Sequence, residues 1–233
     1  MPADNDEDQS VVLRPRTWKT PPMPGIKSQD IILLLKLVSL ERQLGQARVA
    51  ELRAPAEWMG WTPASEEAGA ADLDNEADLY AVRSLEFSTG ISKSEVSGGL
   101  RRSRSVGLLR TDRRSGRPQV NTQGLLELIQ YGLKYFFPAE PGPLVRGIPT
   151  AHAAPVLAGR LIAAGEDIYV WPDAQGLRQG QGIAPLHRCV PIAVRRDAWL
   201  YGCLALVDSI RIGRARESIV AAKLLQSHLG IKP

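Results

Sequence analysis

The sequence predicts a mainly α-helical fold with a small β component, of the α+β class. Apolar residues recur at helical spacing in several segments, two short strand-like runs flank a glycine-containing loop, and proline- and glycine-rich stretches separate these elements. With 233 residues, 44% of them hydrophobic, the chain can form one large domain or two small ones. We therefore expect two folded units with cores of their own.

The N-terminal region predicts an arm followed by a buried helix. Residues 1–25 are polar and rich in proline, which is typical of a flexible segment. Ser28 can then open a helix from Ile31 to about Leu44, with Asp30 at the positive end of the helix dipole. Its apolar residues are too continuous for a one-sided surface helix, so we expect burial on more than one side.

Residues 53–78 contain prolines, glycines, an acidic run and the two tryptophans Trp58 and Trp61. A loop of this length is either functional or a linker. One hypothesis is that the acidic run folds over a basic surface of the protein and imitates a polyanion. The alternative is a solvated linker whose tryptophans pack locally.

A helix, a tight break and a second helix follow this insertion. Residues 79–87 have helical apolar spacing, and Gly90 can adopt the positive φ that a sharp turn needs. Ser92 and Glu95 have the spacing of a capping box, and Ile91 can pack against Val96 as a hydrophobic staple. The sequence therefore predicts a second helix that begins at Ser92.

The faces of this second helix can be assigned from its periodicity. Val96, Leu100 and Val106 mark the buried side. The expected solvent side comprises Lys93, Ser94, Ser97, Gly98, Arg101, Arg104 and Ser105. Gly98 and Gly99 each cost about 1 kcal/mol in helix propensity relative to alanine, which close approach of this helix to a groove would offset.

An arginine-rich hairpin is predicted directly after the helix stop at Gly107. Residues 108–112 and 119–121 read as short strands around the turn 113–118. From Lys93 to Arg117 the chain carries eight basic and two acidic side chains, so this segment is at +6 while the whole chain is at only +4. The basic residues are Lys93, Arg101, Arg102, Arg104, Arg110, Arg113, Arg114 and Arg117. A solvated, solubilising face is the alternative reading of such a charge run.

Residues 79–121, with the helix before them, resemble the winged helix-turn-helix of bacterial transcriptional regulators, loosely of the MarR-like type. The resemblance implies sequence-selective binding of double-stranded DNA, usually as a homodimer. Ser94, Ser97 and Arg101 would read bases, and Lys93 and the hairpin arginines would contact phosphates. The expected DNA-binding residues are Lys93, Ser94, Ser97, Arg101, Arg102, Arg104, Arg110, Arg113, Arg114 and Arg117.

The remaining chain predicts a linking helix and a C-terminal α+β domain. Asn121 can cap a helix that ends at Phe137, and the proline- and glycine-rich residues 138–149 are the expected domain boundary. The division is thus a winged helix-turn-helix domain at 26–137 and a domain for dimerisation, partner binding or effector sensing at 138–233. Beyond the boundary we expect a helix at 154–164, a strand at 168–171, a glycine-rich loop at 176–182, and helices at 196–212 and 215–229.

The chemistry-bearing residues of this C-terminal part predict no catalytic site, metal or cofactor. His187 and Cys189 lack the further ligands of a zinc site and the orienting acid of a nucleophile pair, and the glycines at 176–182 lack the lysine of a phosphate loop. Thr150 can cap a following helix or place His152 in a pocket. Asp208 and Arg211 can form an ion pair at i, i+3, in a structural network or on a docking surface.

Composition limits the cellular compartments that suit this chain. The most hydrophobic uninterrupted run, 31–35, is far shorter than the roughly 20 residues of a membrane span, and the acidic N-terminus is unlike a secretory signal. Two cysteines, Cys189 and Cys203, suit a reducing compartment, with a bridge between them left open. We expect a cytoplasmic dimeric repressor; the alternatives are an antitoxin-like or defence-system subunit that holds a partner protein and autoregulates, and an enzyme acting on nucleic acid.

Overall fold

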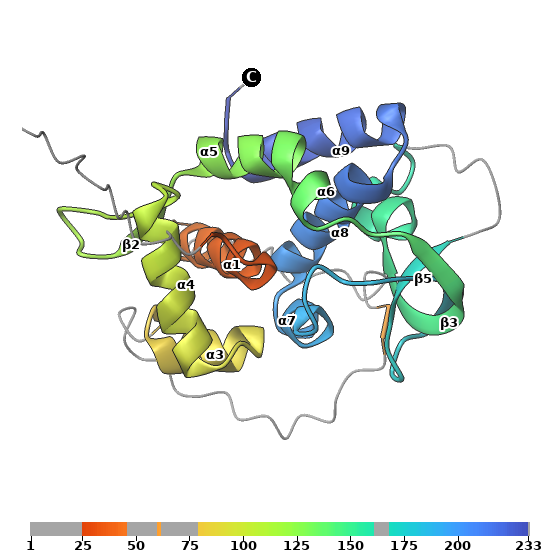
Figure 1. The fold of residues 1–233 in the computed structure, drawn as a ribbon, viewed down its shortest axis with the longest axis horizontal. Coiled ribbons are helices and arrows are strands. Elements are labelled where there is room, and N and C mark those ends of the chain that lie inside the picture. The colour runs from red at the N-terminus through yellow and green to blue at the C-terminus, as the bar shows by residue number, and fades with distance from the viewer. Residues whose placement is uncertain (1–24, 46–59, 62–78, 161–167, 233) are drawn as a thin grey trace, which may run out of the picture.

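The computed structural model describes residues 25–45, 60–61, 79–160 and 168–232, and it is mainly helical with small sheets, as predicted (Figure 1). Its helices are α1 (Ser28–Gly45), α3 (Val82–Thr89), α4 (Lys93–Ser105), α5 (Thr122–Glu127), α6 (Leu133–Phe136), α7 (Val190–Arg196), α8 (Ala198–Ile212) and α9 (Ala215–His228). The strands are β1 (Leu109–Thr111), β2 (Pro118–Val120), β3 (Pro141–Thr150), β4 (Tyr169–Pro172) and β5 (Arg178–Ile183).

Helix α1 lies in the middle of the molecule, with α4 on one side and α8 on the other (Figure 1). Its buried apolar side chains are Ile31, Ile32, Leu33, Leu34, Leu35, Leu37, Val38 and Leu40. The predicted burial on more than one side is therefore confirmed. A helix that is apolar nearly all round is stable in water only when other elements cover it, and α3, α4, α5, α8 and β2 do so here.

An ion pair inside the core fixes α1 to the C-terminal half. Lys36 Nζ lies 2.8 Å from Asp197 Oδ2, and the side chains are only 6% and 1% exposed. Ser39 donates a second hydrogen bond of 2.6 Å to the same oxygen. The other oxygen, Asp197 Oδ1, accepts the Leu200 N–H and so caps α8. One carboxylate thus joins the middle of α1 to the start of α8.

The segment expected to be the domain boundary, 138–149, lies largely in strand β3, which belongs to a closed three-stranded barrel. β3 pairs antiparallel with both β4 and β5, and β4 runs parallel to β5. The glycine-rich residues expected to form a loop belong largely to β5, and a Cβ on Gly180 would lie 2.3 Å from the Ile168 carbonyl oxygen. Glycine there permits close packing of strands, which explains a composition that resembles a loop.

Two further sequence predictions for this half are wrong. In the described part of residues 154–164 there is no α-helix, only the 3₁₀ turn Pro155–Leu157, which follows another at Ala151–Ala153. Thr150 does not cap a helix; its hydroxyl donates to Asp208 at 2.9 Å. Helix α7 was not predicted, whereas β4, α8 and α9 lie close to their expected positions.

Asp208 joins the barrel to α8. Its Oδ2 accepts hydrogen bonds from Thr150 and from the Trp171 indole at 2.5 Å, and its Oδ1 lies 2.6 Å from Arg211. Burial raises the pKa of Asp208, and the charge and hydrogen bond of Arg211 counteract that rise. The predicted i, i+3 pair is confirmed, and because both side chains are 2% exposed it is internal rather than part of a docking surface.

Apolar side chains from both sides of residue 138 form one continuous core. Helix α8 is buried from Leu200 to Arg211 and contacts α1 as well as α9 and the barrel. The division into two folding units stays a prediction. No helix in the described residues has the length and apolarity needed to cross a membrane.

Replacing Lys36 by methionine tests the ion pair at the centre of the core. Lys36→Met keeps the aliphatic stem but leaves Asp197 without its buried cation, so we expect the free energy of unfolding to fall by about 3 kcal/mol. Urea denaturation followed by circular dichroism would measure this. Lys223→Met, at an exposed position of α9, is the matched control and should change the value by less than about 0.5 kcal/mol.

Candidate nucleic-acid interface

Helices α3 and α4 are joined by the tight turn 90–92. Gly90 closes α3 with φ +71°, and its N–H donates to the Glu86 carbonyl at 2.8 Å. Thr89 supports the turn, because its hydroxyl donates to the Leu85 carbonyl at 2.5 Å and accepts the Ile91 N–H at 3.2 Å. The orientation of α4 relative to α3 is therefore set by backbone and side-chain hydrogen bonds.

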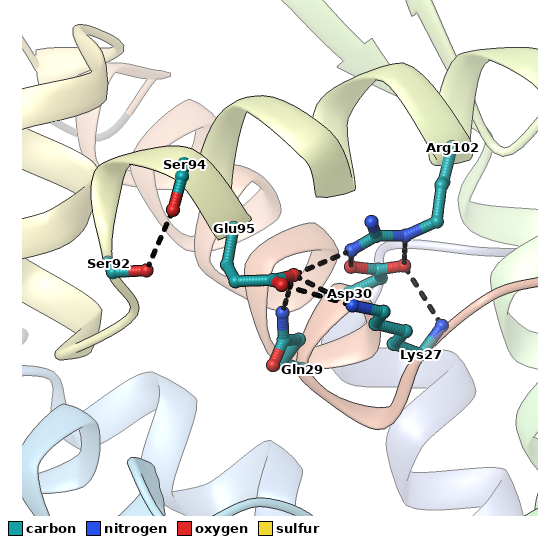
Figure 2. A network of polar contacts seen from close by, with 7 residues as sticks. All are labelled: Lys27, Gln29, Asp30, Ser92, Ser94, Glu95 and Arg102. Atoms are coloured by element: carbon teal, nitrogen blue, oxygen red, sulfur yellow. Dashed lines mark hydrogen bonds and ion pairs between the residues drawn. The ribbon is translucent and has the colours of Figure 1, made fainter. Parts of the chain in front are cut away.

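The capping box predicted at the start of α4 does not form. Ser92 occupies the N-cap position, but its hydroxyl lies 3.4 Å from the Ser94 hydroxyl and accepts no helix N–H. Glu95 turns away from Ser92 and pairs with Lys27 at 3.0 Å, and it also accepts a hydrogen bond from Gln29 (Figure 2). A glutamate at this position can accept a hydrogen bond either from the backbone N–H of the N-cap residue or from a nearby cation. Here the charged Lys27 side chain is the stronger partner.

Arg102 faces inward and is removed from the expected DNA-contacting set. Its guanidinium binds Asp30 with two hydrogen bonds, Nε to Oδ2 at 2.8 Å and Nη2 to Oδ1 at 2.7 Å, and also reaches Glu95 at 3.3 Å (Figure 2). The Arg102 and Asp30 side chains are 8% and 1% exposed. The hydrogen bond with Asp30 is the main cause that raises the pKa of Arg102. This pair fixes α4 against the start of α1.

The two glycines of α4 also face inward rather than toward a groove. A Cβ on Gly99 would lie 2.7 Å from Asp30 Oδ1 and 3.1 Å from a methyl of Leu33, and a Cβ on Gly98 would lie 3.0 Å from Arg102 Nη1. Both glycines are buried. Gly99 therefore permits the close approach of α4 to α1, and Gly98 leaves room for the Arg102 guanidinium.

The outward face of α4 carries a stripe of hydroxyl and basic side chains. Ser94, Ser97, Arg101 and Arg104 are exposed and follow one another at intervals of three or four residues, which places them on one side of a helix. Lys93 is exposed beside them and lies 3.7 Å from Glu86. We name this set of five residues the outer stripe. Val106, expected on the buried side, is exposed at the end of the helix.

The hairpin that follows α4 is confirmed, and it projects beyond α4 away from the C-terminal half (Figure 1). Arg110 faces Gln119 across the two strands and donates to its side chain at 2.9 Å. At the tip, Asp112 accepts the N–H and the hydroxyl of Ser115 at 2.8 and 2.6 Å, which lowers the pKa of Asp112. Arg113 and Arg114 lie exposed on this ordered turn.

Arg117 is the one expected contact residue of the hairpin that is half-buried. It lines a cleft of about 300 Å³ between the hairpin, the end of α1 and the start of α3, together with Glu41 and Tyr80. The structure therefore leaves nine of the ten expected residues at least partly accessible. They are Lys93, Ser94, Ser97, Arg101, Arg104, Arg110, Arg113, Arg114 and Arg117.

The side chains weighed for catalysis belong to the C-terminal half of the chain. Burial raises the pKa of Cys189 to about 12, so its thiol is protonated at neutral pH, and the Cys189 N–H donates to His187 Nδ1 at 3.3 Å. Cys203 is buried with its pKa also raised, and the bridge to Cys189 is not formed. His152 packs edge-on against Tyr169 at 4.9 Å. Within the described ranges no three His, Cys, Asp or Glu side chains are grouped to hold a metal ion.

The arm 1–25 and the acidic insertion 53–78 lie almost wholly outside the described residues. The hypothesis that the acidic run folds over a basic surface and imitates a polyanion therefore stays a prediction. Gly60 and Trp61 are the described part of the insertion. Trp61 does not pack locally: it is buried, bridges to Gly176 and stacks edge-on against Tyr201 at 5.5 Å.

The Asp30–Arg102 pair was missed by sequence reasoning, although two signals were present. Asp30 begins a run of apolar residues, and Arg102 follows Val96 and Gly99 at helical spacing on the inward side.

Comparison with protein-family models, with curated proteins and with solved structures returned no match to this chain.

Two adjacent arginines of α4 should respond oppositely to substitution. Arg102→Ala leaves Asp30 buried without its cation, and we expect the free energy of unfolding to fall by about 3–5 kcal/mol. Arg101→Ala removes an exposed side chain and should change it by less than about 0.5 kcal/mol. Equal losses in urea titrations of the two variants would contradict the inward placement of Arg102.

The stability contributed by Glu95 should depend on pH. The hydrogen bond from Lys27 is the main cause that lowers the pKa of Glu95 below its ordinary value of 4.5. A carboxylate with a lowered folded-state pKa stabilises the fold above its unfolded-state pKa, and that stabilisation is lost as the pH falls through the folded-state value. The melting temperature of the wild type should therefore exceed that of Glu95→Gln at neutral pH, and the difference should close below pH 4.5. A difference independent of pH would exclude this charge interaction.

Proposed function

We propose that this protein is a sequence-specific DNA-binding regulator of transcription that grips a duplex with a winged helix-turn-helix. Helices α1, α3 and α4 and the β1–β2 hairpin follow one another in the order that this motif requires. A short turn joins α3 to α4, and the hairpin follows α4 directly. In this arrangement the second helix of the pair enters the major groove and the hairpin lies along the backbone beside it.

The main support for this proposal is the set of side chains exposed on α4 and on the hairpin tip. The long exposed side chains of α4 and of the hairpin tip are basic: Lys93, Arg101, Arg104, Arg113 and Arg114. The two acids of the segment are engaged elsewhere, Glu95 with Lys27 and Asp112 with Ser115. A surface of this sign releases counterions when it meets a duplex, and this release provides affinity for DNA of any sequence.

Selectivity among sequences requires contacts with base edges. Ser94, Ser97 and Arg101 lie on successive turns of α4, starting near its N-terminus. The N-terminal part of a recognition helix is the part that contacts base edges in the groove. Arginine pairs with guanine through two hydrogen bonds, and serine is short enough to let the helix approach closely. We assign base recognition to these three residues and phosphate contacts to Lys93 and the hairpin arginines.

The rigid packing of α4 against α1 supports this assignment. Arg102 and Gly99 hold the inner face of α4 against α1, so the outer stripe projects from a fixed support. Groups that are already in place before binding lose less conformational entropy when they contact DNA. We propose that output is repression in the cytoplasm, by occupancy of a promoter.

Two arginine substitutions separate base recognition from phosphate contact. After selection of a preferred site from random duplexes, Arg101→Ala should weaken binding to that site by about 1–3 kcal/mol and relax the preference. Arg114→Ala should weaken selected and unrelated duplexes alike and should lower the slope of log Kd against log salt concentration by about one. Fluorescence anisotropy at several salt concentrations would measure both effects.

The matched control is Arg216→Ala, which removes the same charge from an exposed position on α9. If the positive surface is merely solubilising, all three variants should bind DNA equally or not at all. Full retention of binding by Arg101→Ala and Arg114→Ala would refute the proposed contacts.

A further inference from the structure

A small cleft lies where the last turns of α1 meet the junction between α7 and α8. Its volume is about 120 Å³, and its walls are formed by Ser39, Arg42, Gln43, Arg196, Asp197, Ala198 and Trp199. Pockets that enclose a drug-sized ligand have volumes of roughly 300–1,000 Å³, so this cleft suits a smaller group. Its two arginines come from different elements, Arg42 from α1 and Arg196 from the end of α7.

The positive charge of these two arginines is not compensated. In the described ranges of the chain, neither Arg42 nor Arg196 forms an ion pair. Asp197 is the acid of the lining, but its charge is balanced by Lys36 and both of its oxygens already accept hydrogen bonds. The cleft therefore keeps an excess of two positive charges.

Two buried donors on the walls of the cleft lack an acceptor. The Arg42 guanidinium carbon lies 5.7 Å from the centre of the Trp199 ring, and Arg42 Nη1 donates to the His228 carbonyl at 3.0 Å. Arg42 Nε and the Trp199 indole Nε1 are buried and have no hydrogen-bond partner in the part of the chain that the structure describes. Buried N–H groups are nearly always satisfied by protein, water or an ion. Two such groups beside one cleft indicate that an acceptor binds there.

Arg196 reaches the cleft from its solvent side. Its exposed guanidinium lies over the Phe87 ring, 4.2 Å from the ring centre, and Nη1 donates to the Phe87 carbonyl. A guanidinium has five N–H donors, so others remain for a ligand. The cleft also lies at the first turn of α8, a helix of 15 residues, whose dipole favours a negative charge at this end.

We propose that this cleft is a binding site for a small oxyanion, either a phosphate or the carboxylate of a small metabolite. Arginine binds such groups through two parallel hydrogen bonds, which are about twice as strong as those between neutral groups. Arg42 and Arg196 bind the anion from two sides, and the Trp199 indole donates a further hydrogen bond. An uncharged ligand would leave the two positive charges uncompensated. The site is separate from the outer stripe, so this inference goes beyond DNA binding.

Isothermal titration calorimetry of the full chain tests the proposal without DNA. Inorganic phosphate and succinate would be titrated separately, at millimolar concentrations, in a chloride buffer of low ionic strength. At least one of the two should bind saturably, with one site per chain. The anion that binds more tightly distinguishes a phosphate site from a carboxylate site.

Two substitutions identify the cleft as the site. Trp199→Phe keeps an aromatic ring beside Arg42 but removes the indole N–H, which has no partner in the described fold. The dissociation constant of the anion should rise by about tenfold, as expected for the loss of one hydrogen bond to a charged group. Arg196→Ala should raise it by about tenfold or more. Circular dichroism would verify that both variants are folded.

The matched control is again Arg216→Ala, at an exposed position of α9, which should bind the anion like the wild type. The absence of saturable binding of either anion would overturn the inference. So would a dissociation constant that is unchanged in either cleft variant. An equal loss of affinity in Arg216→Ala would overturn it as well, because binding would then reflect the net positive charge of the chain. DNA binding by the outer stripe can fail or succeed independently, in the anisotropy measurements.

Discussion

The burial of α1 from Gln29 to Leu40 is the constraint on which the rest of the structure depends. A helix this apolar cannot stand at a surface, so elements from both halves of the chain must cover it. Its two buried charges make the covering specific: Asp30 pairs with Arg102 of α4, and Lys36 pairs with Asp197 at the start of α8. Apolar packing alone would permit α4 or α8 to slide along α1. The two ion pairs define one position for each.

This arrangement connects the candidate interface to the opposite side of the molecule. Arg102 and Gly99 hold α4 on one face of α1, and Asp197 begins α8 on another. Asp208, further along α8, holds the barrel through Thr150 and Trp171. Three separate buried polar clusters, which α1 and α8 connect, therefore lie between the proposed DNA-reading helix and strands β3 and β4. The barrel is thus part of the support of the outer stripe.

The elements that could be predicted from the sequence are those whose signals are local. The helical period of α1, the helix break at Gly90, the turn before Gly116 and the cap at Asn121, whose side chain accepts the Gly124 N–H, all lie within a few residues of what they determine. The barrel could not be predicted because β3 and β5, two of its three strands, are rich in proline or glycine. In β3 and β5 these residues permit close approach between distant strands, which composition alone cannot distinguish from a loop.

Within the candidate interface the exposed stripe followed from helical periodicity, whereas the inward contacts did not. Glu95 has the spacing of a capping residue, and only the tertiary structure reveals Lys27 and Gln29, more than sixty residues earlier, as its partners. Arg101 and Arg102 are identical in chemistry. They differ in the side of α4 on which they lie, so that Arg101 is exposed and Arg102 is buried. A buried aspartate within an apolar run is the sign that such an arginine must exist elsewhere in the chain.

The π turn at Leu128–Gly132, between α5 and α6, gives this region a tolerance to a change in chain length. A π turn holds one residue more than the regular turn that it replaces, so removal of a single codon there would leave an unbroken α-helix. The side chains beyond the deletion would keep nearly their present directions, because the extra residue is taken up within the wider turn. Leu133 would therefore stay in the core, and the change would be confined to the turn itself. One amino acid can thus be gained or lost at this point without displacing the helix that follows.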